Sequence, residues 1–283
     1  MYFRRLRVAT NILILNLAIA DLMISLFCMP FSYWHVIIFN DQRWIFGAFF
    51  CKLFAFIQAT AVFLSSWTLV TISLDRFTAI IFVFIPSLRL TFRRAILLVI
   101  LTWIFSSVMA APLFYVNQVY EVNGVEVCDE YGWQQLEKLF GSGITHTYGT
   151  LLFALQYCLP LFVLFVTYLA IGIKMWNRRI PGDGRYNQGF TKQRYKPVKK
   201  MVRMVLFVSA LYAFCWFPQN LLMNILLPWN SRIASHPYIL YFWWTAHTIA
   251  MFHSIVNAFI YYDRNARFRE GFRFFLRFIP FVK

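Results

Sequence analysis

Long apolar segments recur along the chain, and short polar stretches separate them. Each is long enough to cross a hydrocarbon core of about 30 Å. A surface helix of a soluble protein carries a polar stripe at a period of 3.6 residues, whereas these segments are apolar on nearly every face. The pattern therefore predicts an all-α membrane helical bundle with six crossings in a single transmembrane domain, residues 1–283. The predicted spans are roughly 8–39, 48–74, 95–116, 148–173, 201–228 and 237–262.

The composition and the distribution of charge agree with a membrane protein. Hydrophobic residues make up 60% of the chain and charged residues only 13%. If both termini are cytoplasmic, the inner segments hold 23 of the 27 lysines and arginines, which is the positive-inside bias. Because these basic residues lie in short juxtamembrane loops, anionic lipid accounts for them, and nucleic-acid binding is disfavoured. We expect a multi-pass protein with a cytoplasmic C-terminus.

The two ends of the chain differ in character. Only a few residues precede the first span, so the sequence predicts no secretory signal peptide. Near the other end, Phe268, Phe272 and Phe275 recur at helical spacing among arginines. This pattern predicts an interfacial helix over residues 265–279 that lies along the inner leaflet.

One predicted helix carries polar residues near both membrane surfaces. Gln58 lies eighteen residues before Arg76, which is five helical turns, so both share one face about 27 Å apart. Asp75 can restrain the neighbouring guanidinium of Arg76, which stays charged and offers five donors. The alternative is an ion pair that snorkels at the interface.

Asp21 is the only acid deep within a predicted span. An ionisable group costs about 2.5–3.5 kcal/mol at such a depth and is usually functional. The alternative is a protonated Asp21 that is hydrogen-bonded to Asn257.

Trp216 lies two residues before Pro218, and a proline inside a helix removes a backbone hydrogen bond and kinks it. This pair predicts a pivot. Tryptophans in membrane helices also serve as interface anchors, but Trp216 lies near mid-membrane, which disfavours that interpretation.

The predicted outer loop from about 117 to 147 is acidic, with five carboxylates against one lysine. Such a cluster can steer a cationic ligand, although charged loops are often merely solvated. The candidate ligand-steering residues are Glu126, Asp129 and Glu130.

Catalytic and metal-binding patterns are weak. His247 and His253 are six residues apart, which places them on different helix faces. The sequence has no Walker glycine loop and no Gly-x-Ser-x-Gly motif. We therefore expect no enzyme and no cofactor. A transporter is the second class considered, but transporters tend to show repeated halves or several charges at mid-membrane.

Six motifs occur in an order that resembles the rhodopsin-like, class A G-protein-coupled receptors. Gln58 and the stretch Phe214–Gln219 look most like the branch for neuropeptide Y, neuropeptide F and RFamide peptides. The six motifs are Leu17–Leu22, Asp75–Phe77, Trp103, Pro160 with Tyr168, Phe214–Pro218 and Asn257–Tyr261.

The resemblance implies roles for the inner half of the bundle. Arg76 is expected to be released on activation and to meet a heterotrimeric G protein, with Tyr168 and Tyr261 in support. A sodium ion that favours the inactive state is expected at Asp21, Ser65, Ser254 and Asn257.

The resemblance also implies an outer ligand site in the plasma membrane. A disulfide between Cys51 and Cys128 is expected to join the Gln58 helix to the outer loop. The expected ligand is a peptide ending in Arg-Phe-amide or Arg-Tyr-amide, whose aromatic amide descends toward Gln58 and Gln219.

The chain departs from this family pattern in two places. The first of seven crossings is absent, so six helices are expected, and Arg4, Arg5 and Arg7 look like the first inner loop. The family's Asn-Pro is replaced by Asn257-Ala258. The sequence predicts a neuropeptide receptor, and the alternatives are a truncated fragment that signals poorly or a membrane transporter.

Overall fold

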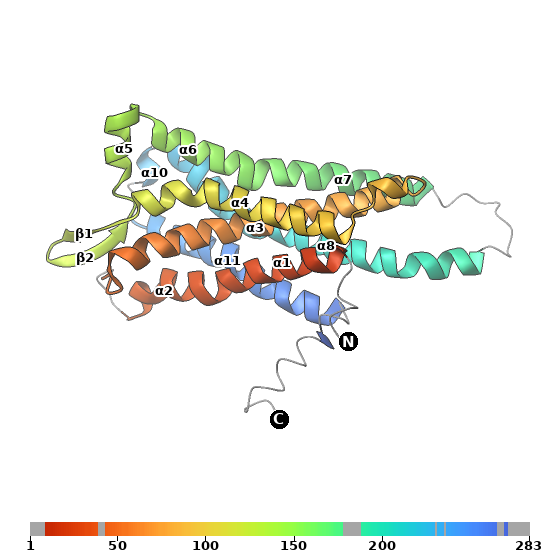
Figure 1. Ribbon diagram of the computed structural model, residues 1–283. Coiled ribbons are helices and arrows are strands. Elements are labelled where there is room, and N and C mark those ends of the chain that lie inside the picture. Colours follow the sequence, from red (N-terminus) through yellow and green to blue (C-terminus); the bar gives the residue numbers. More distant parts are fainter. Residues whose placement is uncertain are drawn as a thin grey trace, which may run out of the picture.

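The computed structural model describes residues 9–38, 43–177, 188–229, 231–234, 236–264 and 269–270. Long helices run side by side along one axis, with a hairpin and short helices at one end (Figure 1). The all-α membrane bundle predicted from the sequence is confirmed. Five of the described helices are long and apolar enough to cross a membrane, namely Ala9–Tyr33, Gly47–Ile81, Phe92–Val116, Ile144–Trp176 and Lys200–Leu226.

The sixth predicted span falls on α11 (Ile239–Arg264), a helix of 26 residues. At 1.5 Å per residue it is about 39 Å long, enough to cross a bilayer. Helix α11 is not among the five apolar helices named above, because polar side chains lower its mean hydropathy. Three of these polar residues, His247, His253 and Asn257, are buried inside the bundle. They face the protein interior and not the lipid.

The first described helix is continuous but not uniform. It comprises α1 (Ala9–Met23), a π-helical turn η2 (Ile24–Cys28) and α2 (Met29–Ile38). After it, α3 (Gly47–Ile81) runs the full depth of the bundle, and α4 (Phe92–Val116) returns. The short helix η3 (Pro86–Leu88) lies between α3 and α4. Thr91 caps α4 by accepting a hydrogen bond from the backbone N–H of Arg94.

A β-hairpin that was not predicted from the sequence follows α4. Strands β1 (Gln118–Val122) and β2 (Val125–Asp129) are antiparallel. Asn123 and Gly124, both with positive φ, form the two-residue turn, and Asn-Gly is the strongest short-range signal for such a turn. The helix α5 (Trp133–Phe140) comes next.

The second half of the chain contains two further helices interrupted by π turns. The first comprises α6 (Ile144–Phe153), η4 (Ala154–Cys158) and α7 (Leu159–Asn177). The second comprises α8 (Gln188–Leu221), η5 (Leu222–Leu226) and α9 (Leu227–Trp229). Helix α8 begins thirteen residues before the predicted span at 201, since hydropathy identifies only the lipid-embedded part of a helix. The short α10 (Ser231–Ala234) precedes α11.

Pro160 has no N–H, so it leaves one backbone carbonyl a turn earlier without its helical donor. Side chains from two other helices donate to two adjacent carbonyls of η4. Trp67 Nε1 on α3 donates to the Leu155 carbonyl at 3.1 Å, and Tyr212 Oη on α8 donates to the Gln156 carbonyl at 2.8 Å. These two bonds tie α3 and α8 to η4 at one level of the bundle.

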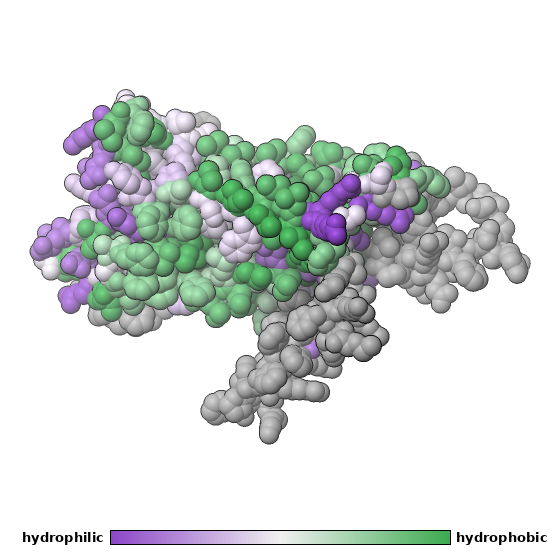
Figure 2. All heavy atoms as spheres, in the orientation of Figure 1, coloured by the Kyte–Doolittle hydropathy of each residue, from purple (hydrophilic) through white to green (hydrophobic). Residues whose placement is uncertain are grey.

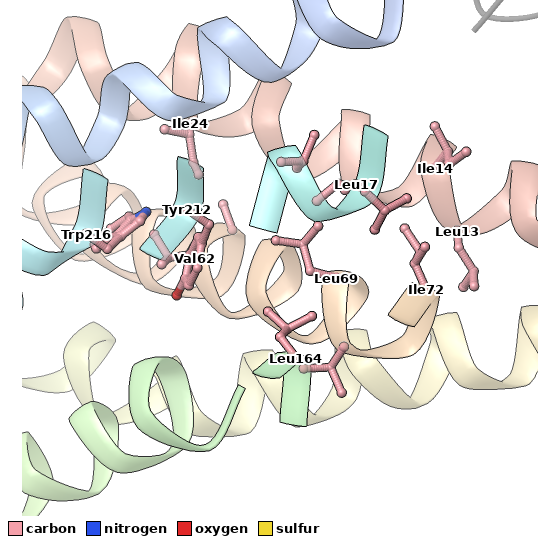
Figure 3. Close-up of a cluster of buried hydrophobic side chains, with 14 of the residues drawn as sticks. Leu13, Ile14, Leu17, Ile24, Val62, Leu69, Ile72, Leu164, Tyr212 and Trp216 are labelled. Atoms are coloured by element: carbon pink, nitrogen blue, oxygen red, sulfur yellow. The ribbon is translucent and has the colours of Figure 1, made fainter. Parts of the chain in front are cut away.

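Polar and apolar contacts both hold the centre of the bundle. Trp103 Nε1 donates to Asn16 Oδ1 at 2.9 Å, and Asn16 Nδ2 donates to Thr68 Oγ1 at 2.8 Å, which joins α4, α1 and α3. Figure 3 shows the apolar core between these helices, α7 and α8. Its labelled residues are Leu13, Ile14, Leu17, Ile24, Val62, Leu69, Ile72, Leu164, Tyr212 and Trp216.

Hydrophobic side chains also cover the outside of the bundle. In Figure 2 they form a belt over its middle, and hydrophilic side chains gather toward the ends. Large residues such as Phe162, Phe165 and Phe214 are exposed on this surface. A water-soluble protein would not expose so much apolar surface, whereas lipid accommodates it, so the chain is a multi-pass membrane protein. The predicted interfacial helix 265–279 lies outside the described residues, except for 269–270.

Candidate functional site

The end of the bundle that carries the hairpin, predicted to be the outer end, is built around a disulfide between Cys51 in α3 and Cys128 in β2. This confirms the pairing expected from the sequence. The backbone N–H of Trp44 also donates to the Glu126 carbonyl at 2.7 Å. The hairpin is thus attached at the top of α3, next to two cavities.

The first cavity, which we call the neutral cavity, has a volume of about 250 Å³. It lies between η2, α2, α3, α11 and the hairpin, and none of its lining residues is an acid, a lysine or an arginine. Gln58 lies in its wall and accepts a hydrogen bond from Ser32 Oγ at 3.3 Å. Its lining residues are Cys28, Phe31, Ser32, Trp44, Cys51, Phe54, Ala55, Gln58, Asn117, Cys128, Trp243, Trp244 and His247.

Aromatic rings form much of the wall of the neutral cavity. Phe31 stacks on Phe54 with ring centroids 3.7 Å apart. The ring of Trp243 stacks on that of His247 at 4.7 Å. A flat apolar group with a polar end can therefore contact ring faces here and hydrogen-bond to Gln58, Ser32 or His247.

The second cavity, which we call the acidic cavity, is larger, at about 420 Å³. It lies between α6, α8, η5 and the segment before α5. Glu130, Trp133 and His146 contribute to its outer part, while Trp216 and Gln219 come from α8. Its lining residues are Leu113, Glu130, Trp133, Thr145, His146, Tyr148, Gly149, Thr150, Leu152, Phe153, Gln156, Trp216, Gln219, Asn220, Met223, Asn224 and Pro228.

The structure divides the predicted ligand residues between these two places. Gln58 lines the neutral cavity, whereas Gln219 and Glu130 line the acidic cavity. Glu126 and Asp129 lie on the exposed hairpin and line neither cavity. Gln58 and Gln219 thus line two different cavities, and the approach of one aromatic amide to both residues stays a prediction.

Several lining residues were not predicted as site residues. Ser32 and Asn117 look unremarkable in an apolar segment, and only three-dimensional packing reveals them. His247 was considered as a metal ligand only. The sequence feature that could have indicated a binding-site role for His247 is its position one helical turn after two tryptophans.

Trp216 connects the acidic cavity to the centre of the bundle. Its side chain lines that cavity, and its Nε1 donates to His253 Nδ1 at 3.2 Å. The ring of His253 is fully buried, and its Nδ1 lies 3.5 Å from the hydroxyl of Ser254. Pro218 follows Trp216 within α8, where the sequence analysis placed a pivot. A polar chain thus runs from the cavity toward Asp21.

Asp21 lies at the end of this chain and is buried. Its carboxylate accepts hydrogen bonds from Asn257 Nδ2 at 3.2 and 3.4 Å. Ser65 and Ser254 lie beside the same carboxylate, and the buried Ser65 hydroxyl has no hydrogen-bond partner within the described part of the chain. A carboxylate and hydroxyl oxygens are the hard ligands that suit a small cation, so the residues fit the expected sodium ion.

At the opposite end of the bundle, predicted to be the inner end, Asp75 and Arg76 form an ion pair, and both side chains are largely buried. Thr10 on α1 was not predicted here. Its hydroxyl donates to Asp75 Oδ2 at 3.0 Å and also contacts the Arg76 guanidinium. Thr10 therefore links the ion pair on α3 to α1, while Asp75 restrains the guanidinium of Arg76.

Two tyrosines lie close to this inner end. Tyr168 on α7 lies near Ser209 and Arg76, and its hydroxyl is buried. Tyr261 on α11 is buried in the core and borders a small void together with Leu17, Leu69 and Met204. Neither side chain is exposed at the surface.

These features define a class of protein: a multi-pass helical membrane protein, with two cavities at the hairpin end and a buried ion pair at the opposite end. Residues 1–261 match the family described as 7 transmembrane receptor (rhodopsin family), and the chain belongs to this family. The family consists of receptors, which agrees with the prediction that the chain is not an enzyme.

Similar proteins carry the names of peptide receptors. The chain is 52% identical over 280 residues to Neuropeptide receptor 22 of Caenorhabditis elegans, covering 97% of this chain and 63% of that protein. It is 32% identical to the RYamide receptor of Tribolium castaneum, covering 98% and 74%. It is also 32% identical to the Substance-P receptor of Aquarana catesbeiana, covering 99% and 65%. The chain thus spans less than two thirds of the nematode and frog proteins.

Proposed function

We propose that this chain is a plasma-membrane receptor for a C-terminally amidated cationic neuropeptide and that it activates a heterotrimeric G protein. The observation that carries this proposal is that one helix contributes residues to both ends of the bundle. Helix α3 carries Gln58 in the wall of the neutral cavity and Arg76 in the inner ion pair. The names of the similar proteins support a peptide ligand.

The chemistry of the neutral cavity fits an aromatic amide. A C-terminal phenylalanine or tyrosine amide has a flat ring and a carboxamide without charge. The ring finds aromatic faces, and the carboxamide both donates to and accepts from groups such as Gln58 and Ser32. A free carboxylate would lose its hydration without meeting a cation in the cavity lining.

Ligand binding favours one of two bundle arrangements in this mechanism. The ligand shifts the population only as far as it binds the active arrangement more tightly. In the resting arrangement Asp75 and Thr10 hold Arg76. In the active arrangement α8 turns about Pro218, Arg76 is released to the G protein, and Tyr168 and Tyr261 support it.

An allosteric sodium ion belongs to the same proposal. Asp21, Ser65, Ser254 and Asn257 would hold it, and the ion supplies a positive charge that neutralises the Asp21 carboxylate inside the bundle. These side chains come from α1, α3 and α11, so their spacing depends on how the three helices pack. The basic inner segments support a cytoplasmic C-terminus and contact with lipid headgroups.

The experiment is a G-protein activation assay in cells exposed to a panel of amidated neuropeptides. We expect activation by peptides ending in an aromatic amide and a large loss with the matched free acids. Arg76→Ala should abolish the response at unchanged surface expression, whereas Arg93→Ala, on the same side of the membrane, should preserve it. A response that survives Arg76→Ala would contradict the coupling mechanism. Substrate flux in proteoliposomes without G-protein activation would instead favour a transporter.

A further inference from the structure

One short helix at the hairpin end of the bundle has an apolar side that the protein covers only in part. At 100° per residue, the apolar residues of α5 share one side of the helix, and the polar residues occupy the other. The apolar residues are Trp133, Leu136, Leu139 and Phe140. Trp133 is buried and Leu136 is half-buried, whereas Leu139 is 71% exposed and Phe140 is 72% exposed. Helix α5 is therefore amphipathic, and the last turn of its apolar side is uncovered.

Two contacts attach the covered part of α5 to the first turns of α6. Thr145 Oγ1 donates to Glu137 Oε1 at 2.7 Å. The ring centroids of Trp133 and Tyr148 are 5.1 Å apart. The indole Nε1 of Trp133 also donates to Glu130 Oε2 at 2.7 Å, and both residues line the acidic cavity. The same helix therefore carries part of the cavity wall and the uncovered apolar turn.

The turn between α5 and α6 keeps the exposed pair next to a membrane span. Gly141 and Gly143 both have positive φ, which glycine adopts without steric cost, so the chain changes direction directly after Phe140. Phe140 precedes the span Ile144–Trp176 by four residues, which limits its separation from the first residue of the span to about 14 Å. The uncovered end of α5 therefore lies at the level of the first turns of this span.

This level corresponds to the headgroup region of a bilayer. The span Ile144–Trp176 has 33 residues, which is about 50 Å of helix, whereas the hydrocarbon core is about 30 Å thick. The segment between Gly143 and Leu151 contains three threonines and a histidine, so the first turns of α6 are the polar part of the span. We conclude that these turns lie among lipid headgroups and that the hydrocarbon core begins near Leu151.

The direction of α5 agrees with this level. Figure 1 shows α5 at the edge of the bundle, running across the axis of the long helices. Hydrophobic side chains gather over the same corner in Figure 2. A helix that crosses the bundle axis lies parallel to the membrane plane, which is the orientation of an interfacial amphipathic helix.

We propose that α5 is an interfacial membrane helix and that Leu139 and Phe140 insert into the leaflet on the hairpin side of the bundle. Lipid covers this turn, because it continues the apolar belt of the bundle at a level that the bilayer reaches. Lys138 lies on the polar side of α5, and its ammonium can reach lipid phosphates. The membrane then holds the helix that carries Trp133 at the acidic cavity. The inference requires that the chain spans a membrane and not that it binds a peptide.

The depth of α5 can be measured with nitroxide labels on single cysteines, in lipid nanodiscs and without any ligand or G protein. Cys158 is exposed, whereas Cys28 and Cys215 are buried, so every labelled chain also carries Cys158→Ser. Each label is tested for accessibility to oxygen, which concentrates in the bilayer, and to a water-soluble nickel chelate. The ratio of the two accessibilities reports the depth of the label.

Four positions are compared. Phe140→Cys reports on the apolar side of α5 and Gln134→Cys on its polar side. Leu151→Cys on the exposed surface of α6 is the membrane reference, and Glu121→Cys on the exposed hairpin is the aqueous reference. We expect the oxygen-to-nickel ratio at 140 to shift from the hairpin value toward the value at 151, and the ratio at 134 to stay near the hairpin value. A hairpin-like ratio at 140 would overturn the proposal. So would exclusion of both reagents at 140, because another protein surface would then cover the residue.

A pair of double variants tests whether lipid holds the helix. Leu139→Gln with Phe140→Gln removes the apolar contact, so a label at Gln134→Cys should become more mobile in nanodiscs. Leu139→Met with Phe140→Met keeps the turn apolar and should leave this label as immobile as in the parent chain. Equal mobility in all three chains would contradict membrane attachment. A chain that no peptide activates but whose α5 labels report insertion would keep this inference and refute the proposed function, and an activated chain with hairpin-like labels would do the reverse.

Discussion

Tyr157 and Tyr212 each donate a hydrogen bond to the backbone of the other's helix. Tyr157 Oη donates to the Ala213 carbonyl at 2.9 Å, and Tyr212 Oη donates to the Gln156 carbonyl at 2.8 Å. Each acceptor is therefore the residue next to the opposite tyrosine. The two bonds join η4 to α8 one turn before Trp216, so they restrain the helix that is proposed to turn during activation.

Tyr212→Phe should destabilise the resting arrangement. The substitution keeps the ring but removes the hydrogen bond to the Gln156 carbonyl. A hydrogen bond of this kind contributes about 0.5–1.5 kcal/mol to stability. We expect a lower melting temperature in detergent and higher basal G-protein activation than in the parent chain.

The partner substitution and a control complete this prediction. Tyr157→Phe should act in the same direction, and the double variant should show less than the sum of the two effects, because the bonds support one contact. Tyr238 is largely exposed, and Tyr238→Phe should change neither quantity. Basal activity at the parent level in all variants would show that the contact does not restrain α8.

Thr10→Val should loosen the inner ion pair. Valine has the shape of threonine without the hydroxyl that donates to Asp75. A hydrogen bond to a charged group contributes about 1.5–3 kcal/mol, so Arg76 should be released more often. We expect increased basal nucleotide exchange, measured on membranes with purified G protein. Thr10→Ser retains the hydroxyl and should behave like the parent, and increased exchange in both variants would point to packing instead.

Hydropathy and motif order predicted the helices, the membrane and the disulfide well. These features depend on properties that each segment carries by itself, such as length, apolarity and the exposure of Cys51 and Cys128 to an oxidising compartment. Thr10 was missed because a threonine in an apolar segment has no signal of its own. Its role exists only because α1 brings it to Asp75.

The placement of the predicted ligand residues in two cavities was also beyond the sequence. Gln58 and Gln219 belong to different helices, and a pattern along one helix does not tell which cavity a neighbouring helix encloses. The π turns shift the direction of side chains without changing the hydrophobic pattern, so α6, α7 and α8 looked regular. The hairpin was predictable, since Asn123-Gly124 lies between valine residues.

Sodium should lower agonist affinity through Asp21. We expect binding of an amidated peptide to weaken when sodium replaces N-methylglucamine at constant ionic strength. Asp21→Asn removes the charge that holds the ion while keeping the shape, and it should abolish this dependence. Ser254→Ala removes one oxygen and should reduce it. A sodium effect that persists in Asp21→Asn would place the ion elsewhere.

The acidic cavity should make peptide affinity depend on pH. Burial, with a further contribution from the Asp129 charge, raises the pKa of Glu130 above its usual value, and the hydrogen bond from Trp133 opposes this. The carboxylate is charged above its pKa, so affinity for an arginine-bearing peptide should be full at neutral pH. It should decline as the pH falls through the raised pKa, earlier than an ordinary carboxylate would allow. The measurement is equilibrium binding between pH 7.5 and 5, with a peptide that carries citrulline in place of arginine as the matched ligand.

The effects of other ionisable groups near the cavity on the pH profile must be distinguished from the effect of Glu130. His146 and Tyr148 line it, and histidine is the side chain whose charge normally changes between pH 5 and 8. A protonated His146 would also repel the ligand, so the profile is compared in Glu130→Gln and His146→Gln. If Glu130 causes the decline, Glu130→Gln flattens the profile at a low affinity, and His146→Gln leaves its slope intact. A slope that disappears only in His146→Gln would assign the pH dependence to the histidine.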